Sequence, residues 1–228
     1  MIRFVRLNKR KISSPLARIS RQKALRMMET SYLAAASSLI WVALYYLPIG
    51  GALFRLALPL PLTLLQVRRG SSSGVEGVAL TVLLLSALMG PVRGPLFLFP
   101  YGLLAFWLGW SWNRGLSWWF SWGAGVLIGT CGFFVRVLVL SLLVGENLWV
   151  IITRAGAGLI ERFVDLLHLP LVPELSQVQL VAFSLVVVQE MVYVLTLHAL
   201  AFWIFPRLQS SIPEPPNILN GLVALDPL

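Results

Sequence analysis

The chain is poor in charge, in cysteine and in histidine, and these shortages exclude several classes of protein. Charged residues make up 12% of its 228 residues, about half of the share in a soluble domain. A single cysteine, Cys131, excludes an intrachain disulfide. The two histidines, His168 and His198, have no cysteine or carboxylate at ligand spacing around them, so we expect no metal site and no cofactor.

Apolar residues dominate instead. They account for 58% of the chain, and the mean hydropathy is +0.83. A run of about 20 apolar residues is long enough to cross a bilayer as a helix. We therefore expect a single-domain, all-α integral membrane protein with about six transmembrane helices. The predicted spans are Thr30 to Leu47, Gly50 to Val67, Val75 to Met89, Pro95 to Trp112, Trp118 to Val144, and Gln177 to Phe205.

More polar segments flank and interrupt these spans. Residues 1–29 carry nine lysines or arginines and form a predicted basic tail before the transmembrane domain, residues 30–206. Charged residues interrupt the apolar positions of residues 146–170, which predicts an outer amphipathic or re-entrant helix. Residues 207–228 are rich in proline and polar residues and form a predicted flexible tail.

The positive charges set the expected orientation. Lysine and arginine collect on the cytoplasmic side of a membrane protein. With both termini in the cytoplasm, the inner segments carry 13 of these residues and the outer segments carry 3. A basic tail is also typical of nucleic-acid binding, but its position before a span favours contact with anionic lipid. We expect the lipid bilayer, and no nucleic acid, as its partner.

Prolines and tryptophans mark two further segments. Pro59 and Pro61 each remove a backbone donor, so the second span should be kinked. Either this kink faces a polar interior that satisfies the freed carbonyls, or it serves packing alone. Six of the nine tryptophans lie in residues 107–122, which favours an aromatic belt at the inner interface over a stacking platform for a ligand.

Three ionisable side chains fall inside the predicted spans. A charge at this depth needs a partner, a cavity or a function. Arg55, Arg136 and Glu190 all fall in the outer half or near the midplane, so we expect them to converge on one pocket. Two interpretations stay open. Glu190 pairs with Arg136 and specifies the fold, or the arginines hold an acidic ligand while Glu190 accepts a hydrogen bond from it.

Neighbouring residues extend this candidate site. Gln179 and Tyr193 share the helical face of Glu190. The Gly-Pro-rich turn of residues 90–95 carries Arg93, a predicted gate at the mouth of the pocket. Three glycines share one helical face with Arg136 and form either a groove or a surface for close helix packing. They are Gly125, Gly129 and Gly132.

The sequence argues against catalysis. It contains no paired carboxylates and no Ser/His or Cys/His pair on facing spans. His198 lies on a different helical face from Glu190. A Walker A sequence is also absent, so any ATP hydrolysis would come from separate subunits. We therefore expect a protein that is not an enzyme.

The basic tail, the small residues of the first span, the GPVRGP turn and the outer amphipathic insertion together resemble the YybS-like multi-span membrane family of bacteria, including cyanobacteria. That family is similar to the S-components of energy-coupling-factor (ECF) transporters. The resemblance implies a subunit in the bacterial plasma membrane, or in the thylakoid membrane of a cyanobacterium. It also implies a transmembrane coupling subunit, which would dock on Ala34 and Ser38, and separate ATPases that supply the energy.

Two functions are compatible with these features. The first is a membrane-embedded, S-component-like subunit that binds a small, acidic metabolite or vitamin for transport. The alternative is a scaffold or assembly factor that transports nothing and contacts a larger membrane complex through its spans and basic tail.

Overall fold

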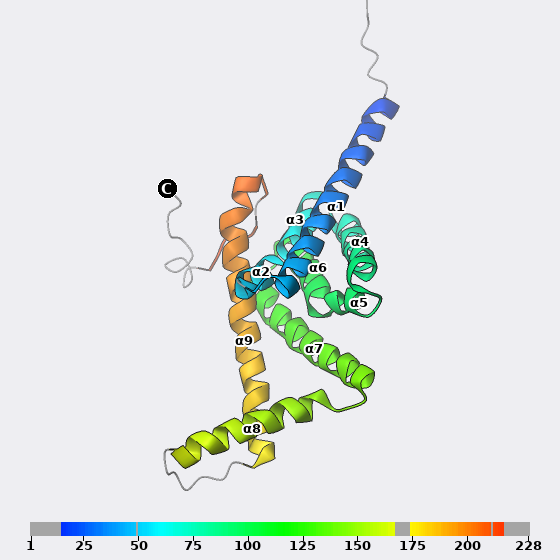
Figure 1. Ribbon diagram of the computed structural model, residues 1–228. Helices are drawn as coiled ribbons and strands as arrows, with labels where there is room; N and C mark the ends of the chain where they lie inside the picture. The colour runs from blue at the N-terminus through cyan, green and yellow to red at the C-terminus, as the bar shows by residue number, and fades with distance from the viewer. Residues whose placement is uncertain (1–14, 49, 167–173, 211, 217–228) are drawn as a thin grey trace, which may run out of the picture.

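The computed structural model describes residues 15–48, 50–166, 174–210 and 212–216. All regular elements in these residues are helices (Figure 1). They are α1 (Pro15–Tyr46), α2 (Gly51–Ala57), α3 (Leu60–Arg69), α4 (Ser71–Met89), α5 (Arg93–Phe97), the π-helix η1 (Leu98–Gly102), α6 (Leu103–Asn113), α7 (Trp118–Val144), α8 (Leu148–Leu166), α9 (Leu175–Ile204) and the 3-10 helix η2 (Pro206–Leu208).

Ion pairs join α1, α3 and α4 at one end of the molecule, which we name the basic end. Arg26 in the first half of α1 pairs with Glu76 of α4 at 2.7 Å. Glu29, one turn later, accepts hydrogen bonds of 2.6 and 2.8 Å from Arg69 at the end of α3. Helices α1 and α4 therefore run away from the basic end, and α3 runs toward it.

The remaining long helices continue this alternation. Asn113, the last residue of α6, donates to a backbone carbonyl of α3 at 2.8 Å, so α6 ends at the basic end. Helix α7 starts there. His198 of α9 hydrogen-bonds Ser121 early in α7, whereas Glu190 lies against Gly129 further along it. Helix α9 is therefore antiparallel to α7, and the described residues make six passes between the two ends.

Four of these passes are single helices that are long and apolar enough to cross a membrane. They are Arg21–Tyr46 in α1, Ser71–Met89, Trp118–Val144 and Leu175–Ile204. The other two passes are composite, one built from α2 and α3 and the other from α5, η1 and α6. The architecture is that of an all-α membrane protein with four helices long enough to span a bilayer among the described residues, and the number of six crossings stays a prediction.

Proline breaks the first composite pass, as the sequence predicts. Pro59 has no N–H to donate to the carbonyl of Arg55, four residues earlier. Tyr193 of α9 replaces this donor with its hydroxyl at 2.9 Å. Ser37 of α1 donates to the carbonyl of Leu58 at 3.3 Å. Side chains of the bundle thus satisfy backbone groups at the break, which a membrane interior requires.

Parts of both predicted tails have defined structure. Helix α1 begins at Pro15, so residues 15–29 of the predicted tail are helical. At the other end, Arg68 Nε donates to Ser210 Oγ at 3.2 Å, and Trp118 Nε1 donates to the carbonyl of Pro213 at 2.8 Å. The predicted flexible tail is therefore packed on the bundle at these residues. The rest of both predicted tails, residues 1–14 and 217–228, lies outside the described residues.

Helix α8 lies across the ends of α7 and α9 that are far from the basic end (Figure 1). Gly145, at a φ of 80°, ends α7 in a left-handed conformation and redirects the chain into α8. Arg154, Glu161 and Arg162 are exposed on α8. The structure thus places a helix over most of the predicted amphipathic segment, whose last residues fall outside the described ranges.

Two of the six clustered tryptophans lie in the core. Trp112 and Trp118 are each 4% exposed, and their ring centroids lie 5.2 Å from that of His198. The His198 ring also lies 3.1 Å from the hydroxyl of Ser121. The prediction of an interfacial belt is wrong for these two rings because they surround a buried histidine. Trp119, which is 49% exposed, does face outward.

Candidate functional site

Glu190 is a buried acid in the middle of α9. Its side chain is 2% exposed, and its Oε1 lies 3.9 Å from Nη2 of Arg55 on α2. Its Oε2 has no hydrogen-bond partner among the described residues. A carboxylate oxygen without a hydrogen-bond partner is costly in a medium of low dielectric constant, and an ion pair at 3.9 Å compensates only part of that cost. The acid is paired with Arg55, so the interpretation that pairs it with Arg136 is wrong.

Two residues of α9 hold the guanidinium of Arg55. With its amide turned so that the oxygen faces Arg55, the orientation that satisfies both groups, Gln189 accepts hydrogen bonds of 3.1 Å from both terminal nitrogens. The ring centroid of Tyr193, a predicted site residue, lies 6.0 Å from Arg55 Cζ. Sequence reasoning missed Gln189 because a neighbour of Glu190 on a helix points about 100° away from it. The sequence feature that could have identified Gln189 is its position directly beside Glu190, as a second polar residue inside an apolar run.

The glycine face of α7 packs against these groups. A Cβ added to Gly125 would lie 2.8 Å from a valine side chain of α9, and one added to Gly132 would lie 2.6 Å from a proline of η1. A Cβ on Gly129 would collide with the carboxylate of Glu190. Of the two interpretations of these glycines, close packing is correct. The alternative groove toward Arg136 is filled by α9 and η1.

Arg136 belongs to a different group of side chains. Its Nη2 donates to the hydroxyl of Tyr45 at 2.7 Å, and its Cζ lies 5.6 Å from the ring centroid of Trp41. Glu190 faces Gly129, seven residues before Arg136 on α7, which corresponds to about 10 Å along the helix axis. The predicted convergence of three charges on one pocket is therefore wrong, because the charges form two separate sites.

A pocket of about 510 Å³ opens beside Arg136 at the end of the α1–α6 bundle opposite the basic end. Arg93, the predicted gate, is part of its wall, and its Cζ lies 5.6 Å from the ring centroid of Tyr45. The lining residues are Tyr45, Met89, Gly90, Pro91, Val92, Arg93, Leu96, Arg136 and Leu140. No acid is among them, so the two arginines make this pocket positively charged.

Three other predicted site residues lie away from both groups. Gln179 precedes Glu190 by eleven residues on α9, or about 16 Å along the helix axis. Ala34 and Ser38 are 0% and 2% exposed, and the carbonyl of Ala34 accepts hydrogen bonds from Ser38 and from Thr81 of α4. The prediction that these small residues dock a partner is wrong, because their face of α1 packs inside this chain.

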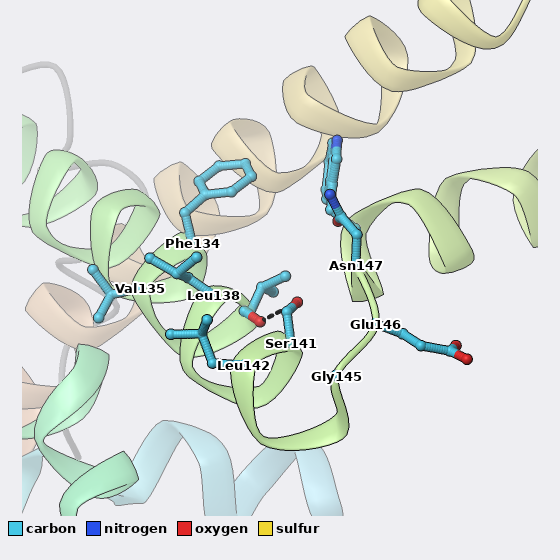
Figure 2. A pocket seen from close by; sticks show the side chains of 10 residues that line it. Phe134, Val135, Leu138, Ser141, Leu142, Gly145, Glu146 and Asn147 are labelled. Atoms are coloured by element: carbon cyan, nitrogen blue, oxygen red, sulfur yellow. Dashed lines mark hydrogen bonds between the residues drawn. The ribbon is translucent and has the colours of Figure 1, made fainter.

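A second pocket, of about 660 Å³, lies where α7 turns into α8 (Figure 2). Phe134, Leu138 and Leu142 supply apolar walls, and Glu146 points away from them in Figure 2. The hydroxyl of Ser141 already donates to a carbonyl of α7 at 2.7 Å and accepts from the first amide of α8 at 3.0 Å. Glu146 is the charged residue of this lining, so the pocket offers no cation to an acidic ligand.

The long apolar helices, with one buried acid between them and one basic pocket at their end, define an α-helical membrane protein. The chain belongs to the family of predicted membrane proteins DUF2232, whose model matches residues 34–220. Comparisons with curated proteins and with solved structures give no match. The family supports the membrane class, whereas the resemblance to YybS-like proteins and to ECF S-components rests on the sequence features alone.

Proposed function

We propose that this protein is a membrane-embedded subunit that binds a small acidic metabolite for a transporter. The observation that carries the proposal is the open pocket of about 510 Å³, whose wall holds two guanidinium groups and no acid. Pockets for small molecules have volumes of about 300–1,000 Å³ and are mostly apolar with a few polar groups that orient the ligand. This pocket has that composition.

The chemistry of the two arginines favours an anion. A guanidinium has several N–H donors and matches the geometry of a carboxylate or a phosphate. Arg136 uses Nη2 for the hydrogen bond to Tyr45, which fixes the orientation of the group and leaves other donors for a ligand. Apolar neighbours such as Leu96 and Leu140 suit the hydrocarbon part of a metabolite.

Transport would require other subunits. The chain has no phosphate-binding loop, so separate ATPases and a transmembrane coupling subunit belong to the proposal, as the resemblance to ECF S-components implies. The docking surface would use exposed side chains in place of Ala34 and Ser38.

A scaffold or assembly role is the second candidate, and one observation favours it. The halves of α7 and α9 that lie far from the basic end extend away from α1–α6 (Figure 1). They carry exposed apolar side chains, among them Leu142, Leu180 and Leu185. Lipid covers such a surface in a subunit that works alone, whereas helices of a larger complex cover it in a scaffold.

Ligand-induced stabilisation tests the proposal. We would measure thermal unfolding of the detergent-purified protein with and without inorganic phosphate, sulfate and a set of dicarboxylates. A ligand at about 100 times its Kd stabilises the folded state by about 2.7 kcal/mol. We expect at least one anion to stabilise the wild type, and Arg136→Ala and Arg93→Ala to lose this effect. Arg154→Ala, at an exposed arginine of α8, is the matched control and should keep it.

The change in unfolding temperature on adding an anion is compared within each variant, because Arg136→Ala also loses its contacts with α1 and is less stable without any ligand. The proposal fails if no anion stabilises the wild type, or if Arg136→Ala and Arg93→Ala respond as the wild type does. The scaffold role gains support if the protein then purifies with a stable membrane partner.

A further inference from the structure

Glu190 has surroundings that suit a bound proton. The side chain is 2% exposed, Oε2 has no partner among the described residues, and Oε1 is 3.9 Å from Arg55. The backbone of α7 lies directly against the carboxylate, since a Cβ on Gly129 would collide with it. An ionised carboxylate with a bare oxygen is costly in such a place, and protonation removes the charge that causes the cost.

Arg55 is the one close cation among the described groups around Glu190. Helix α2 contributes Arg55, α9 contributes the neutral side chains of Gln189 and Tyr193, and α7 contributes the backbone at Gly129. Tyrosine hydroxyls are neutral near pH 7. The balance between the charged and neutral forms of Glu190 therefore depends on Arg55 and then on the more distant Arg136.

Packed aromatic rings connect Glu190 to the basic pocket. Arg136 Cζ lies 5.6 Å from the ring centroid of Trp41, which lies 5.5 Å from that of Tyr101. Tyr101 lies 6.5 Å from Tyr193, whose ring is 6.0 Å from Arg55 Cζ. Protein atoms fill this path, so charges at its two ends interact through a medium that screens them less than water does.

We infer that Glu190 takes up a proton when an anion occupies the pocket of Arg93 and Arg136. This inference rests on the proposed function. An anion neutralises the positive charge of Arg136, about 10 Å from Glu190 along α7, and the loss of that charge favours the neutral carboxyl. A proton from solvent then forms an O–H bond on Glu190, and the anion and the proton bind together.

The coupling has a definite sign. Because linkage is reciprocal, the protonation of Glu190 must also strengthen anion binding. We expect the affinity of the wild type for an anion to rise about tenfold from about pH 8 to about pH 5. Glu190→Gln is permanently neutral and keeps the shape of the side chain. It should bind with an affinity that is independent of pH and equal to that of the wild type at low pH.

The experiment uses anions whose own charge is fixed in this pH range, namely sulfate and methanesulfonate. Titration calorimetry of the purified protein in two buffers of different ionisation enthalpy gives the protons taken up per anion bound. Infrared difference spectroscopy on adding the same anions detects the C=O stretch of a neutral carboxyl. Glu161→Gln, at an exposed acid of α8, is the matched control.

We expect proton uptake and a growing carboxyl band in the wild type and in Glu161→Gln, and neither signal in Glu190→Gln. Binding without proton uptake, or a band that persists in Glu190→Gln, overturns the inference and leaves the proposed function standing. Absence of binding by the wild type to these anions and to the phosphate and dicarboxylate set overturns the proposed function and the linkage together. Thermal unfolding of each variant verifies that it is folded.

Discussion

Gly129 has no side chain, and this leaves the space that the carboxylate of Glu190 occupies against α7. Gly129→Ala would place a Cβ against Oε2 of Glu190 and force α7 and α9 apart. We expect a loss of about 1–3 kcal/mol in the free energy of unfolding, which is typical of overpacking. Gly123→Ala in the same helix is the control, because a Cβ there has no neighbour within 4 Å. Equal losses in the two variants, measured by unfolding in detergent, would refute this account of Gly129.

The sequence identifies the unusual residues more reliably than their partners. Arg55, Arg136 and Glu190 stand out because a charge inside an apolar run is rare. Helical periodicity then gives the face that a residue shares with others on its own helix, but it does not give the rotation of one helix relative to another. This is why the sequence suggests Arg136 as one possible partner of Glu190, although α2 brings Arg55 to it.

At the scale of the element, the break between α2 and α3 depends on a hydroxyl from another helix. The backbone of Leu58 and Pro59 is still in the right-handed helical region, so the break is chiefly a missing N–H donor. Tyr193→Phe removes the hydroxyl that replaces this donor. We expect it to cost about 1–3 kcal/mol, the cost of a buried carbonyl without a partner. Tyr32→Phe, at a tyrosine that is 72% exposed, should be close to neutral.

Pro59→Ala supplies the N–H that the carbonyl of Arg55 lacks. In the double variant with Tyr193→Phe, the helix can make its own hydrogen bond, so we expect the double variant to be more stable than Tyr193→Phe alone. A double-mutant cycle on unfolding free energies measures this coupling. Additive effects would show that the hydroxyl of Tyr193 does not replace the missing donor.

The sequence predicts such breaks well because proline acts locally, through the donor it lacks. It predicts the burial of small residues poorly. Ala34 and Ser38 look the same in the sequence whether their face of the helix meets lipid, a partner or α4. Positive charge is similarly ambiguous at the start of α1. The basic residues there favour a tail by their charge, but lysine and arginine are good helix formers, and residues 15–29 are helical.

At the scale of the whole molecule, contacts at the basic end show the direction in which each pass runs. Helices α1 and α4 both run away from the basic end, where Arg26 meets Glu76, so the composite pass between them must return the chain. The composite pass of α5, η1 and α6 returns it again before α7. Each composite pass contains about 20 residues and is long enough to cross the hydrocarbon layer. The sequence predicts this alternation because hydrophobic runs and charge asymmetry are properties of whole segments.

Labelling with a membrane-impermeant thiol reagent in intact cells tests the six crossings and their orientation. After Cys131→Ala removes the native thiol, a single cysteine is introduced by Lys23→Cys, Arg114→Cys, Val92→Cys or Glu161→Cys, all at exposed positions. Because positive charge is concentrated in the segments at the basic end, we expect the first two variants to react only after permeabilisation. We expect the last two to react in intact cells. Protection of Val92→Cys alongside Lys23→Cys would mean that α1, the α2–α3 pass and α4 do not all cross the membrane. Reaction of Lys23→Cys in intact cells would reverse the orientation and place the basic pocket on the cytoplasmic side.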